Sequence, residues 1–400
     1  MKLLIYSHFF APSIGGVESA VLSLAGGLPK LRTSQGDSEF EVTLVTHTPA
    51  GDFDDESLPF QVVRQPSFLQ LWRIVRQSDV VHIAGPALPP LVLGSLARKP
   101  VVIEHHGYQA ICPNGLLVYQ PDESICPGHF QAGRYGKCLD CRARETSRLR
   151  SLAELLRMFP RFWLCRTVSM NLGISHHVLE RHGLPRSSVV YYGIEDPLAK
   201  DANPSPAANI SGKVCFAYVG RFFPEKGIAI LLRAAGMLMG EGCEFEVRLI
   251  GDGPQRPKLE EIIKANHLSS CVRITGYLTG EALANALHDV RVVVMPSVCE
   301  ETAGLAAIEQ MMRGRLVIAS RIGGLAEVVD DAGLQFPPGN AEALADCMRK
   351  VMQAPSIIDS IGVKARGRAL QLFPRARMVE EHAIAYRKIV RRGSKSLKRN

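Results

Sequence analysis

The sequence contains no uninterrupted apolar run of about eighteen residues, which is the length that a membrane-spanning helix requires. Residues 80–97 come nearest in length, but a histidine and three prolines divide them into a strand, a turn and a helix. The amino-terminal segment MKLLIYSHFFAP has a short apolar core and the alternation of a β-strand, so we interpret it as a first strand and not as an export signal. We therefore expect a cytoplasmic protein.

Two nucleotide-binding motifs are also missing. The dinucleotide fingerprint G-x-G-x-x-G does not occur, and neither does the phosphate-binding loop G-x4-G-K-[ST]. Both motifs act through glycine-rich loops that let the backbone approach phosphates, so their absence argues against NAD and ATP as ligands. No zinc-finger, helix-turn-helix or RNA-binding sheet signature occurs either, which argues against nucleic acid as a partner.

The net charge of +8 is unevenly distributed. Residues 134–166 carry nine basic and three acidic side chains, and residues 375–400 carry nine basic and two acidic ones, which leaves the rest of the chain net acidic. Two localised basic segments favour contact with an anionic surface. Phospholipid headgroups and a phosphate-linked acceptor are the leading candidates, ahead of nucleic acid.

At 400 residues the chain exceeds the size of one hydrophobic core, so we expect two domains. Strand-like and amphipathic helical segments alternate, which predicts an α/β protein with parallel, doubly wound sheets. We predict strands at residues 2–7, 40–48, 80–85, 100–105, 170–175, 188–192, 214–220, 247–250, 272–277, 292–295 and 316–320. The expected organisation is a first domain at 1–196 with an insert at 108–145, a Pro/Ala/Asn-rich linker at 197–212, a second domain at 213–372, and a final helix with a basic tail at 373–400.

The most informative stretch is VVVMPSVCEETAGLAAIE at residues 292–309, which predicts a strand, a short loop and a helix. In a βαβ unit the loop faces the ligand crevice, and the next helix points its amino end there. The N–H groups near Gly304 and Leu305 then favour a phosphate. Glu301 and Glu309 offer carboxylates that suit the hydroxyls of a sugar and of a ribose, although a single carboxylate is more often merely solvated.

Three further loops follow predicted strands. Gly15 and Gly16 open a helix, where the backbone can approach an anion closely. His106 stands at the end of another strand and can donate to a sugar hydroxyl, or it can bond only to nearby backbone. Arg221 and Lys226, five residues apart, place two cations that can neutralise a diphosphate without a metal.

These motifs together resemble the retaining glycosyltransferases of family 4. The matching segments are Gly15-Gly16-x-Glu18, His106-Gly107, Gly220-Arg221-x-x-Pro224-Glu225-Lys226-Gly227, Pro296-Ser297, Glu301-x7-Glu309 and Gly323-Gly324-x-x-Glu327. The resemblance covers nearly the whole chain apart from the cysteine-rich insert and the basic tail. The sequence departs from the family at Thr302-Ala303, where E-G-F-G-L is usual between the glutamates, and at Tyr192, where the family has an asparagine whose donor contact cannot be carried over.

The resemblance implies the GT-B fold, in which two Rossmann-like domains face one another across a cleft. It further implies a hexosyltransferase that moves a sugar from a UDP- or GDP-linked donor to the hydroxyl of a lipid-linked or saccharide acceptor, with retained anomeric configuration and no catalytic cofactor. The first domain then holds the acceptor and the second holds the nucleotide sugar. Cell-envelope polysaccharide or glycolipid synthesis is the expected role.

Residue roles follow from the same resemblance. Gly15 and Gly16 are expected to contact a phosphate through their backbone, and His106 to touch the transferred sugar. Arg221 and Lys226 are expected to bind the diphosphate. Glu301 is expected to hold the donor sugar, and Glu309 the ribose. Residues 273–277 are candidates for base contacts.

Two other functions remain open on the sequence alone. One is a different GT-B activity on nucleotide sugars, such as an epimerase or a hydrolase. The other is a non-catalytic scaffold that binds a nucleotide sugar, although the complete set of Arg221, Lys226, Glu301 and Glu309 argues against it.

Four cysteines lie in the insert, at Cys112, Cys126, Cys138 and Cys141, and His129 is a reserve ligand. A cytosolic chain rarely keeps disulfides, so the pattern favours a structural zinc site, with free thiols or a redox pair as alternatives. The six other cysteines are scattered singly and are expected to be buried thiols.

Residues 145–166 interleave arginines with leucine, phenylalanine and tryptophan. Such a stretch can lie in a membrane interface, or it can pack on the sheet with its arginines in water. Pro160 is expected to divide it, which speaks against one continuous helix. A peripheral position at the inner face of the plasma membrane is the resulting hypothesis.

Overall fold

The computed structural model describes residues 1–13, 15–143, 146–199 and 212–397, and for residues 392–397 it describes the backbone only. Most of the predicted linker at 197–212 therefore lies outside the described residues, as does Glu145. The chain forms two compact units, which are treated separately below. Unit 1 comprises Met1–Glu195 together with Phe373–Asn400, and unit 2 comprises Asp196–Leu372.

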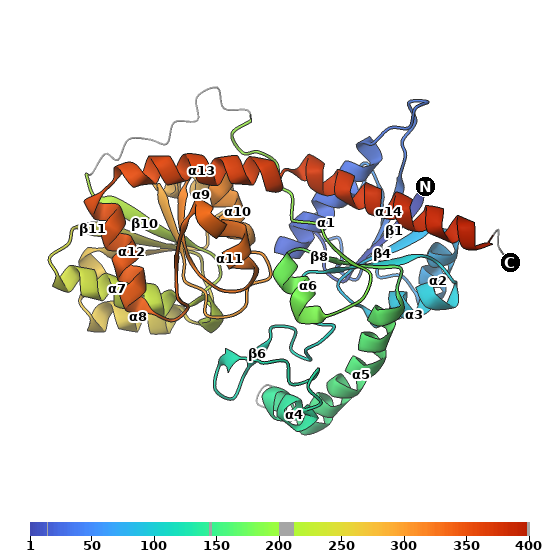
Figure 1. The fold of residues 1–400 in the computed structure, drawn as a ribbon, viewed down its shortest axis with the longest axis horizontal. Coiled ribbons are helices and arrows are strands. Elements are labelled where there is room, and N and C mark those ends of the chain that lie inside the picture. Colours follow the sequence, from blue (N-terminus) through green and yellow to red (C-terminus); the bar gives the residue numbers. More distant parts are fainter. Residues whose placement is uncertain (14, 144–145, 200–211, 398–400) are drawn as a thin grey trace. The chain divides into compact units, whose positions relative to one another are not determined.

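Unit 1 is built on a sheet of seven parallel strands in the order β3-β2-β1-β4-β5-β8-β9 (Figure 1). The strands are β1 Lys2–Ser7, β2 Glu41–Thr46, β3 Gln61–Arg64, β4 Val80–Ala84, β5 Val101–His105, β8 Met170–Gly173 and β9 Ser187–Val189. The helices are α1 Gly16–Gly27, η1 Leu28–Lys30, α2 Phe68–Gln77, α3 Leu88–Leu96, α4 Tyr135–Ala143, α5 Arg148–Thr167, α6 His176–His182 and α14 Arg375–Leu397. The short strands β6 Val118–Tyr119 and β7 Ser124–Ile125 form an antiparallel pair in the insert.

Unit 2 is built on six parallel strands in the order β12-β11-β10-β13-β14-β15 (Figure 1). The strands are β10 Val214–Val219, β11 Phe245–Ile250, β12 Val272–Gly276, β13 Val292–Met295, β14 Leu316–Ser320 and β15 Leu334–Phe336. The helices are η2 Pro224–Lys226, α7 Ile228–Gly240, α8 Arg256–Ala265, η3 Leu268–Ser270, α9 Gly280–Ala286, α10 Leu305–Met312, α11 Gly323–Val329, η4 Asp330–Ala332, α12 Ala341–Gln353 and α13 Ser356–Leu372.

Burial explains why the central strands are so apolar. Every residue of β13 and β14 is buried, and α7 and α12 contribute leucines and alanines to the same core. A parallel sheet is covered on both faces by its crossover helices, so its strands need continuous apolar sequence. This confirms the predicted α/β class with two parallel sheets. Two strands of these sheets, β3 and β15, are missing from the prediction, and both are short and only partly buried.

In each sheet the order of the strands reverses between two neighbouring strands that are distant in sequence. In unit 1 this happens between β1 and β4, and in unit 2 between β10 and β13. The loops at the carboxyl ends of such strands diverge and leave a crevice, which is where open α/β sheets bind ligands. The sheet order therefore places the ligand end of unit 2 at the loops that follow β10 and β13.

The basic stretch forms one continuous helix, α5, with Pro160 inside it. The prediction that Pro160 divides this stretch is wrong. A proline removes one backbone hydrogen bond, but α5 is 20 residues long, Ser147 caps its amino end, and Leu155 and Met158 bury its inner face. These contacts outweigh the missing bond.

The last helix, α14, belongs to unit 1. Its buried side chains join the same core as β1, β2 and α1, and Arg387 pairs with Glu39 at 2.6 Å. A backbone hydrogen bond from the Ile194 N–H to the Phe373 carbonyl lies where the chain re-enters the unit. Among the described residues, no helix has both the length and the apolar content needed to cross a membrane.

Candidate active site

Lys226 and Glu301 form an ion pair in unit 2, beyond the carboxyl ends of β10 and β13, where the strand order reverses. Lys226 Nζ lies 2.6 Å from Glu301 Oε1, and the Ser297 hydroxyl donates to the same oxygen at 2.7 Å. Lys226 ends the turn after β10, and Glu301 stands in the loop after β13. Because β10 and β13 are neighbours, two residues 75 positions apart meet.

Glycine makes this meeting sterically feasible. Gly227 has φ +66°, and a Cβ there would collide with the Pro296 carbonyl oxygen. The Val298 N–H donates to the Glu225 carbonyl at 2.9 Å, which joins the two loops backbone to backbone. The loops are thus held in register before any ligand binds.

Both partners of the pair are charged. Burial acts to raise the pKa of Glu301, but the Lys226 ammonium outweighs it and lowers that pKa below its ordinary value. Burial acts to lower the pKa of Lys226, but the Glu301 carboxylate raises it. A half-buried, ionised pair at a strand end is a typical functional arrangement.

Arg221 lies in the same loop and near the same carboxylate. Its charge also lowers the pKa of Glu301. The Tyr218 hydroxyl donates to the Arg221 carbonyl at 2.9 Å, and the guanidinium carbon lies 5.0 Å from the centre of the Phe223 ring. The structure thus brings the two predicted diphosphate-binding cations together with one predicted sugar-binding carboxylate.

Helix α10 begins at Leu305, with Gly304 preceding it in a left-handed conformation at φ +76°. Among the residues that the structure describes, no side chain caps this end. The first N–H groups of a helix lack partners within the helix and carry a positive partial charge, so this end is suited to an anion.

Glu309 lies on α10 and is largely enclosed. Burial raises the pKa of its carboxyl group, with Arg313 acting weakly against this. Within the described part of the chain, no donor contacts its carboxylate. A half-buried carboxyl group without a partner is available to a ligand that brings hydroxyl donors.

The paired glycines at 323 and 324, after the predicted strand at 316–320, favour a flexible loop, but the structure shows that they begin α11. The Gly324 N–H donates to the Glu301 carbonyl at 2.6 Å. A Cβ on Gly323, which has φ +58°, would lie 2.5 Å from the same oxygen. The helix start therefore packs against the backbone of Glu301 and fixes it.

The candidate base-contact segment lies at the edge of the sheet. Residues 272–276 form β12, the first strand in the sheet order, and Tyr277 is 61% exposed. The Gly251 N–H donates to the Gly276 carbonyl at 2.9 Å, so the loops after β11 and β12 are joined.

In unit 1, Gly15 precedes α1 and Gly16 is its first residue. The Glu18 carboxylate folds back over Gly15, where a Cβ would meet it. An anionic ligand at this helix start has to share the space with Glu18.

His106 is buried, and both of its ring nitrogens face protein groups. Nδ1 lies 2.8 Å from the Tyr192 hydroxyl, and Nε2 lies 3.4 Å from Glu104 Oε2. The rings of His106 and Tyr192 are stacked, with centroids 5.6 Å apart. A sugar hydroxyl can therefore hydrogen-bond to a ring nitrogen of His106 only if Tyr192 or Glu104 moves away from that nitrogen.

Glu104 is the centre of a buried cluster that the sequence did not reveal. His82 Nε2 lies 3.3 Å from Glu104 Oε2, and His382 Nε2 lies 3.4 Å from Glu104 Oε1. Burial acts to raise the pKa of Glu104, but the surrounding histidines hold it well below its usual range. His382 donates from Nδ1 to the Met378 carbonyl at 2.8 Å, and the Glu104 carboxylate raises the pKa of this histidine despite its burial.

The four cysteines of the insert are brought together around one cavity, with His129 in its wall. All ten cysteines are free thiols, and Cys243, Cys271, Cys299 and Cys347 are only partly buried, contrary to the expectation for the scattered group. Burial raises the pKa of Cys138 to about 12 and that of Cys165 to about 12.

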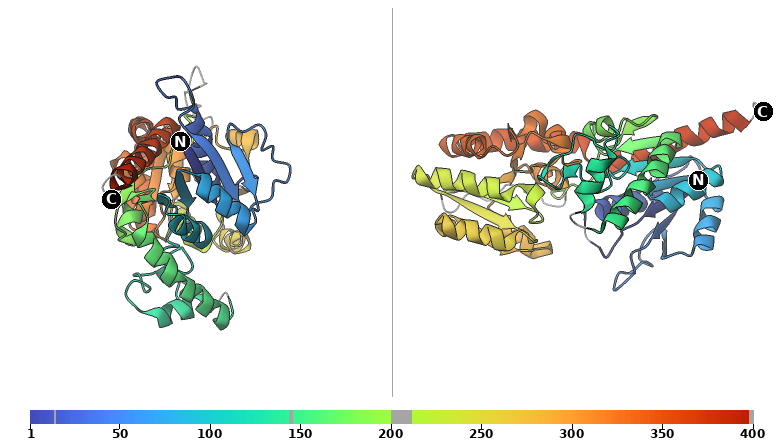
Figure 2. Two further views of the ribbon diagram at one scale, coloured as in Figure 1. Left: turned by 90° about the vertical axis from the view of Figure 1, so that its right-hand side faces the viewer. Right: turned by 90° about the horizontal axis from the view of Figure 1, so that it is seen from below.

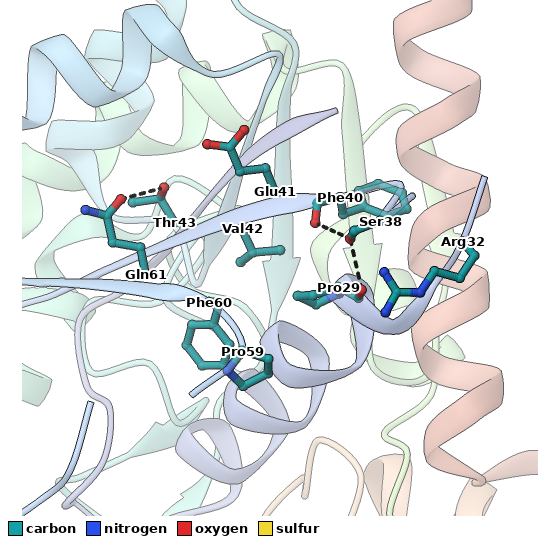
Figure 3. Close-up of a pocket in the computed structure, with 10 residues that line it drawn as sticks. All are labelled: Pro29, Arg32, Ser38, Phe40, Glu41, Val42, Thr43, Pro59, Phe60 and Gln61. Atoms are coloured by element: carbon teal, nitrogen blue, oxygen red, sulfur yellow. Dashed lines mark hydrogen bonds between the residues drawn. The ribbon is translucent and has the colours of Figure 1, made fainter. Parts of the chain in front are cut away.

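A cavity of about 610 Å³ lies elsewhere in unit 1 (Figure 3). Glu41 and Gln61, which line it, are the first residues of β2 and β3. It therefore opens at the amino ends of the strands, whereas ligands of open α/β sheets bind beyond the carboxyl ends. We assign it no part in the candidate site.

Comparison with known proteins gives a family match within the second unit. Residues 213–354 match the family described as Glycosyl transferases group 1. Alpha-D-kanosaminyltransferase of Streptomyces kanamyceticus is 31% identical over 150 residues, which are 37% of this chain and 39% of that protein. The amylovoran biosynthesis glycosyltransferase AmsK of Erwinia amylovora is 24% identical over 315 residues, or 76% of this chain and 72% of that one. The chain spans about two fifths of the length of the first curated relatives that it matches.

Among solved structures, HepE of Anabaena in complex with UDP superposes with a TM-score of 0.70 at 17% identity, covering 97% of this chain and 100% of that one. A likeness at this identity establishes the architecture. The protein accordingly has the GT-B fold, and its second unit carries a segment that matches the group 1 glycosyl transferases.

Proposed function

We propose that the protein is a retaining glycosyltransferase that transfers a sugar from a nucleotide diphospho-sugar to an acceptor hydroxyl. The observation that carries this proposal is the Lys226–Glu301 pair, which sits where β10 and β13 end, beside Arg221. The match of residues 213–354 to the group 1 glycosyl transferases supports the same reaction.

The pair can serve two parts of one donor. Lys226 has three N–H donors and uses one on Glu301 Oε1, so two remain for phosphate oxygens. Both described donors to the Glu301 carboxylate reach Oε1, which leaves Oε2 for the hydroxyls of the sugar. A sugar joined to a diphosphate presents both kinds of group a few ångströms apart.

The rest of the site supplies the nucleotide contacts. The amino end of α10 at Gly304 and Leu305 faces the diphosphate in this proposal, and Glu309 accepts hydrogen bonds from the ribose hydroxyls. The raised pKa of Glu309 suits this role, because a diol supplies the donors that its carboxylate lacks.

The reaction needs no additional base. The acceptor oxygen attacks the anomeric carbon on the face from which the diphosphate leaves, the bond between that carbon and the phosphate oxygen breaks, and the departing phosphate takes the acceptor's proton. Negative charge on the diphosphate grows in the transition state, and Arg221 and Lys226 stabilise it there.

HepE has been crystallised with UDP and with UDP-glucose. On the strength of that structural likeness we propose a UDP-linked donor, with a GDP-linked donor as the second choice. AmsK is named for amylovoran biosynthesis, which supports a role in the synthesis of an envelope or extracellular polysaccharide.

The first test is sugar transfer by the full chain from UDP- and GDP-sugars to acceptors, together with donor hydrolysis without an acceptor. Lys226→Ala and Glu301→Gln are each expected to lower kcat/KM by about 10²- to 10³-fold, because each removes a preorganised contact to the transition state. The exposed Lys258→Ala in the same unit is the matched control and should keep full activity.

Activity of both site variants within a few-fold of wild type would remove these residues from the mechanism. A product that forms without an acceptor would indicate a hydrolase or an epimerase. Nucleotide binding without any turnover would indicate a scaffold.

We also propose that unit 1 rests on an anionic membrane surface through α5. Leu149, Leu152, Leu156, Phe159 and Trp163 recur at spacings of three and four residues and are all exposed, with Leu149 at 82% and Trp163 at 63%. Exposed arginines at 148, 150, 157 and 166 flank this stripe, which is the pattern of an interfacial helix. Arg161 does not belong to this set, because it donates to the Gln109 carbonyl at 3.2 Å.

A further inference from the structure

The insert between β5 and α5 gathers four cysteine side chains at one point. Cys112 follows β5 in a tight turn, Cys126 follows β7, and Cys138 and Cys141 lie one turn apart on α4. All four are at most 8% exposed, and they line one cavity of about 10 Å³, the room that a single water or ion occupies. We propose that these four cysteines bind one zinc ion as thiolates.

Backbone and side-chain groups around the cavity already provide the donors that thiolate ligands need. The Gln120 backbone N–H donates to Cys141 Sγ at 3.4 Å, and the Asn114 side-chain amide donates to the same sulfur at 3.5 Å. At Cys112 the chain turns sharply: the Gly115 N–H donates to the Cys112 carbonyl at 3.0 Å, and Gly115 has φ +73°. Turns of this kind direct backbone N–H groups toward a metal-bound sulfur and orient it.

The charges around the cavity fit a tetrathiolate site. Zinc with four thiolates carries a net charge of −2, and the side chains of Lys137 and Arg142 line the same cavity. Arg142 also pairs with Glu154 at 2.8 Å, which ties α4 to α5. His129 stands in the cavity wall, and within the described residues its Nδ1 has no hydrogen-bond partner.

The insert has little else to hold it together. The small hydrophobic cluster beside it has only four buried residues, Phe130 and Cys138 from the insert and Leu155 and Met158 from α5. In Figure 1 and in the left view of Figure 2, α4 and the β6 region stand out from the sheet of unit 1. A small, loop-rich segment without an adequate core commonly folds around a structural metal.

The sulfurs are wider apart than bound ligands would be. In the described part of the chain, only His82, Glu104 and His382 bring three ligand atoms within 4.8 Å of one another. We explain that second cluster as a buried ion pair of Glu104 and His382 with His82 as a neutral neighbour, since the Nε2 atom of each histidine faces an oxygen of the Glu104 carboxylate. The four cysteines are expected to draw inward by small side-chain rotations when zinc binds.

The site connects directly to the loop that carries His106. The Cys112 N–H donates to the Tyr108 carbonyl at 2.8 Å, and the Tyr108 N–H donates to the Gly115 carbonyl at 3.0 Å. Zinc at this point would therefore hold the end of the loop after β5 as well as the insert itself.

The test is metal analysis of the full chain purified under reducing conditions without chelators. We expect one zinc atom per chain, and in the cobalt-substituted protein we expect the thiolate-to-metal charge-transfer bands of a tetrahedral sulfur site. The double variant Cys138→Ser/Cys141→Ser should lose the metal, whereas Cys243→Ser/Cys271→Ser, which lies outside the insert, should keep it. The variant His382→Gln should also keep it, because His382 belongs to the other cluster.

Protease resistance gives a readout that does not depend on activity. Removing zinc with a chelator should expose residues 108–143 to cleavage while the sheet of unit 1 stays intact. Fewer than about 0.2 zinc atoms per wild-type chain, metal loss in His382→Gln but not in the cysteine double variant, or two disulfides among the four cysteines in protein isolated without reductant would each overturn the proposal.

Discussion

Glu104 carries a negative charge inside the core of unit 1. Its carboxylate is surrounded by the ring nitrogens of His82, His106 and His382, and these residues come from β4, the loop after β5, and α14. Removing one member of a buried ion pair leaves the other without compensation, at a cost of about 3–5 kcal/mol. We therefore expect this small cluster to contribute strongly to the free energy of unfolding of unit 1.

The pH dependence of this pair can be predicted from its pKa shifts. The pKa of His382 is raised, so its contribution is present below about pH 6.5 and is lost as pH rises through the folded-state value. The pKa of Glu104 is lowered, so its contribution is present above about pH 4.3 and is lost as pH falls. His82, whose pKa burial lowers, stays neutral in the folded state and opposes folding only in acid. In urea unfolding, His382→Gln should therefore lose more stability relative to wild type at pH 6 than at pH 9.

An exposed histidine provides the control for that measurement. His288→Gln should leave stability unchanged at both pH values. A loss in His382→Gln that is equal at pH 6 and pH 9 would show that His382 contributes packing but not charge.

At the residue scale, the sequence indicated where the candidate residues stand relative to the strands, but it did not indicate which residues they contact. Lys226 and Glu301 were both expected just after strands, because a basic or acidic residue that follows a predicted strand can be recognised from the sequence alone. Their direct pairing depends on β10 lying next to β13, which only the folded sheet decides. The Glu104–His382 contact joins residues 278 positions apart with no shared motif, so no local pattern could indicate it.

At the scale of elements, the sequence pattern of helix α5 predicted its amphipathic character but not its continuity. Its basic and aromatic composition predicted an amphipathic segment, and the exposed apolar stripe fits that prediction. Its continuity through Pro160 was not predictable from propensity, because the packing of Leu155 and Met158 decides it.

Vesicle co-sedimentation tests the role of this stripe. Leu156→Glu/Trp163→Glu should reduce binding to vesicles rich in phosphatidylglycerol by roughly tenfold or more, because each substitution removes an apolar anchor. Neutralising Arg148, Arg157 and Arg166 together should reduce it by a similar factor, and more so at low salt. Binding to vesicles of neutral lipid should be weak for all chains.

Leu370→Glu on α13 is the matched control, since it also adds a charge at an exposed leucine, 41% exposed. Unchanged lipid binding of the double variant would refute the membrane role. A wild-type dimer that the double variant disperses, without lipid binding in either chain, would assign the stripe to a second copy of this protein.

At the scale of the whole molecule, unit 1 is discontinuous in sequence. Its core contains Met378, Val379 and Tyr386 from α14, and the Tyr386 hydroxyl lies 2.9 Å from His82 Nδ1. Unit 2 is one continuous segment with its own core. The two-domain α/β architecture followed from length and from alternating patterns, whereas the contribution of a carboxyl-terminal helix to the first core depends on contacts such as Tyr386–His82, 304 positions apart, which no local pattern indicates.

A chain that ends at Leu372 should therefore lose the fold of unit 1 while unit 2 persists. Limited proteolysis with mass spectrometry should recover a resistant fragment within residues 212–372 and rapid cleavage of residues 1–195. A chain that ends at Arg391 retains the buried side chains of α14 and should resist proteolysis like the full protein. Equal resistance of residues 1–195 in both truncated chains would contradict this.

Because unit 1 is discontinuous in sequence, its parts are synthesised at different times. The strands of the first sheet leave the ribosome long before the helix that completes their core, because residues 196–372 are translated in between. Phe40 and the neighbouring apolar surface of the nascent amino-terminal half stay uncovered until the last helix leaves the ribosome. During that interval we expect a chaperone to bind the uncovered apolar surface. Slow translation of the second unit would lengthen the time for which this surface is exposed.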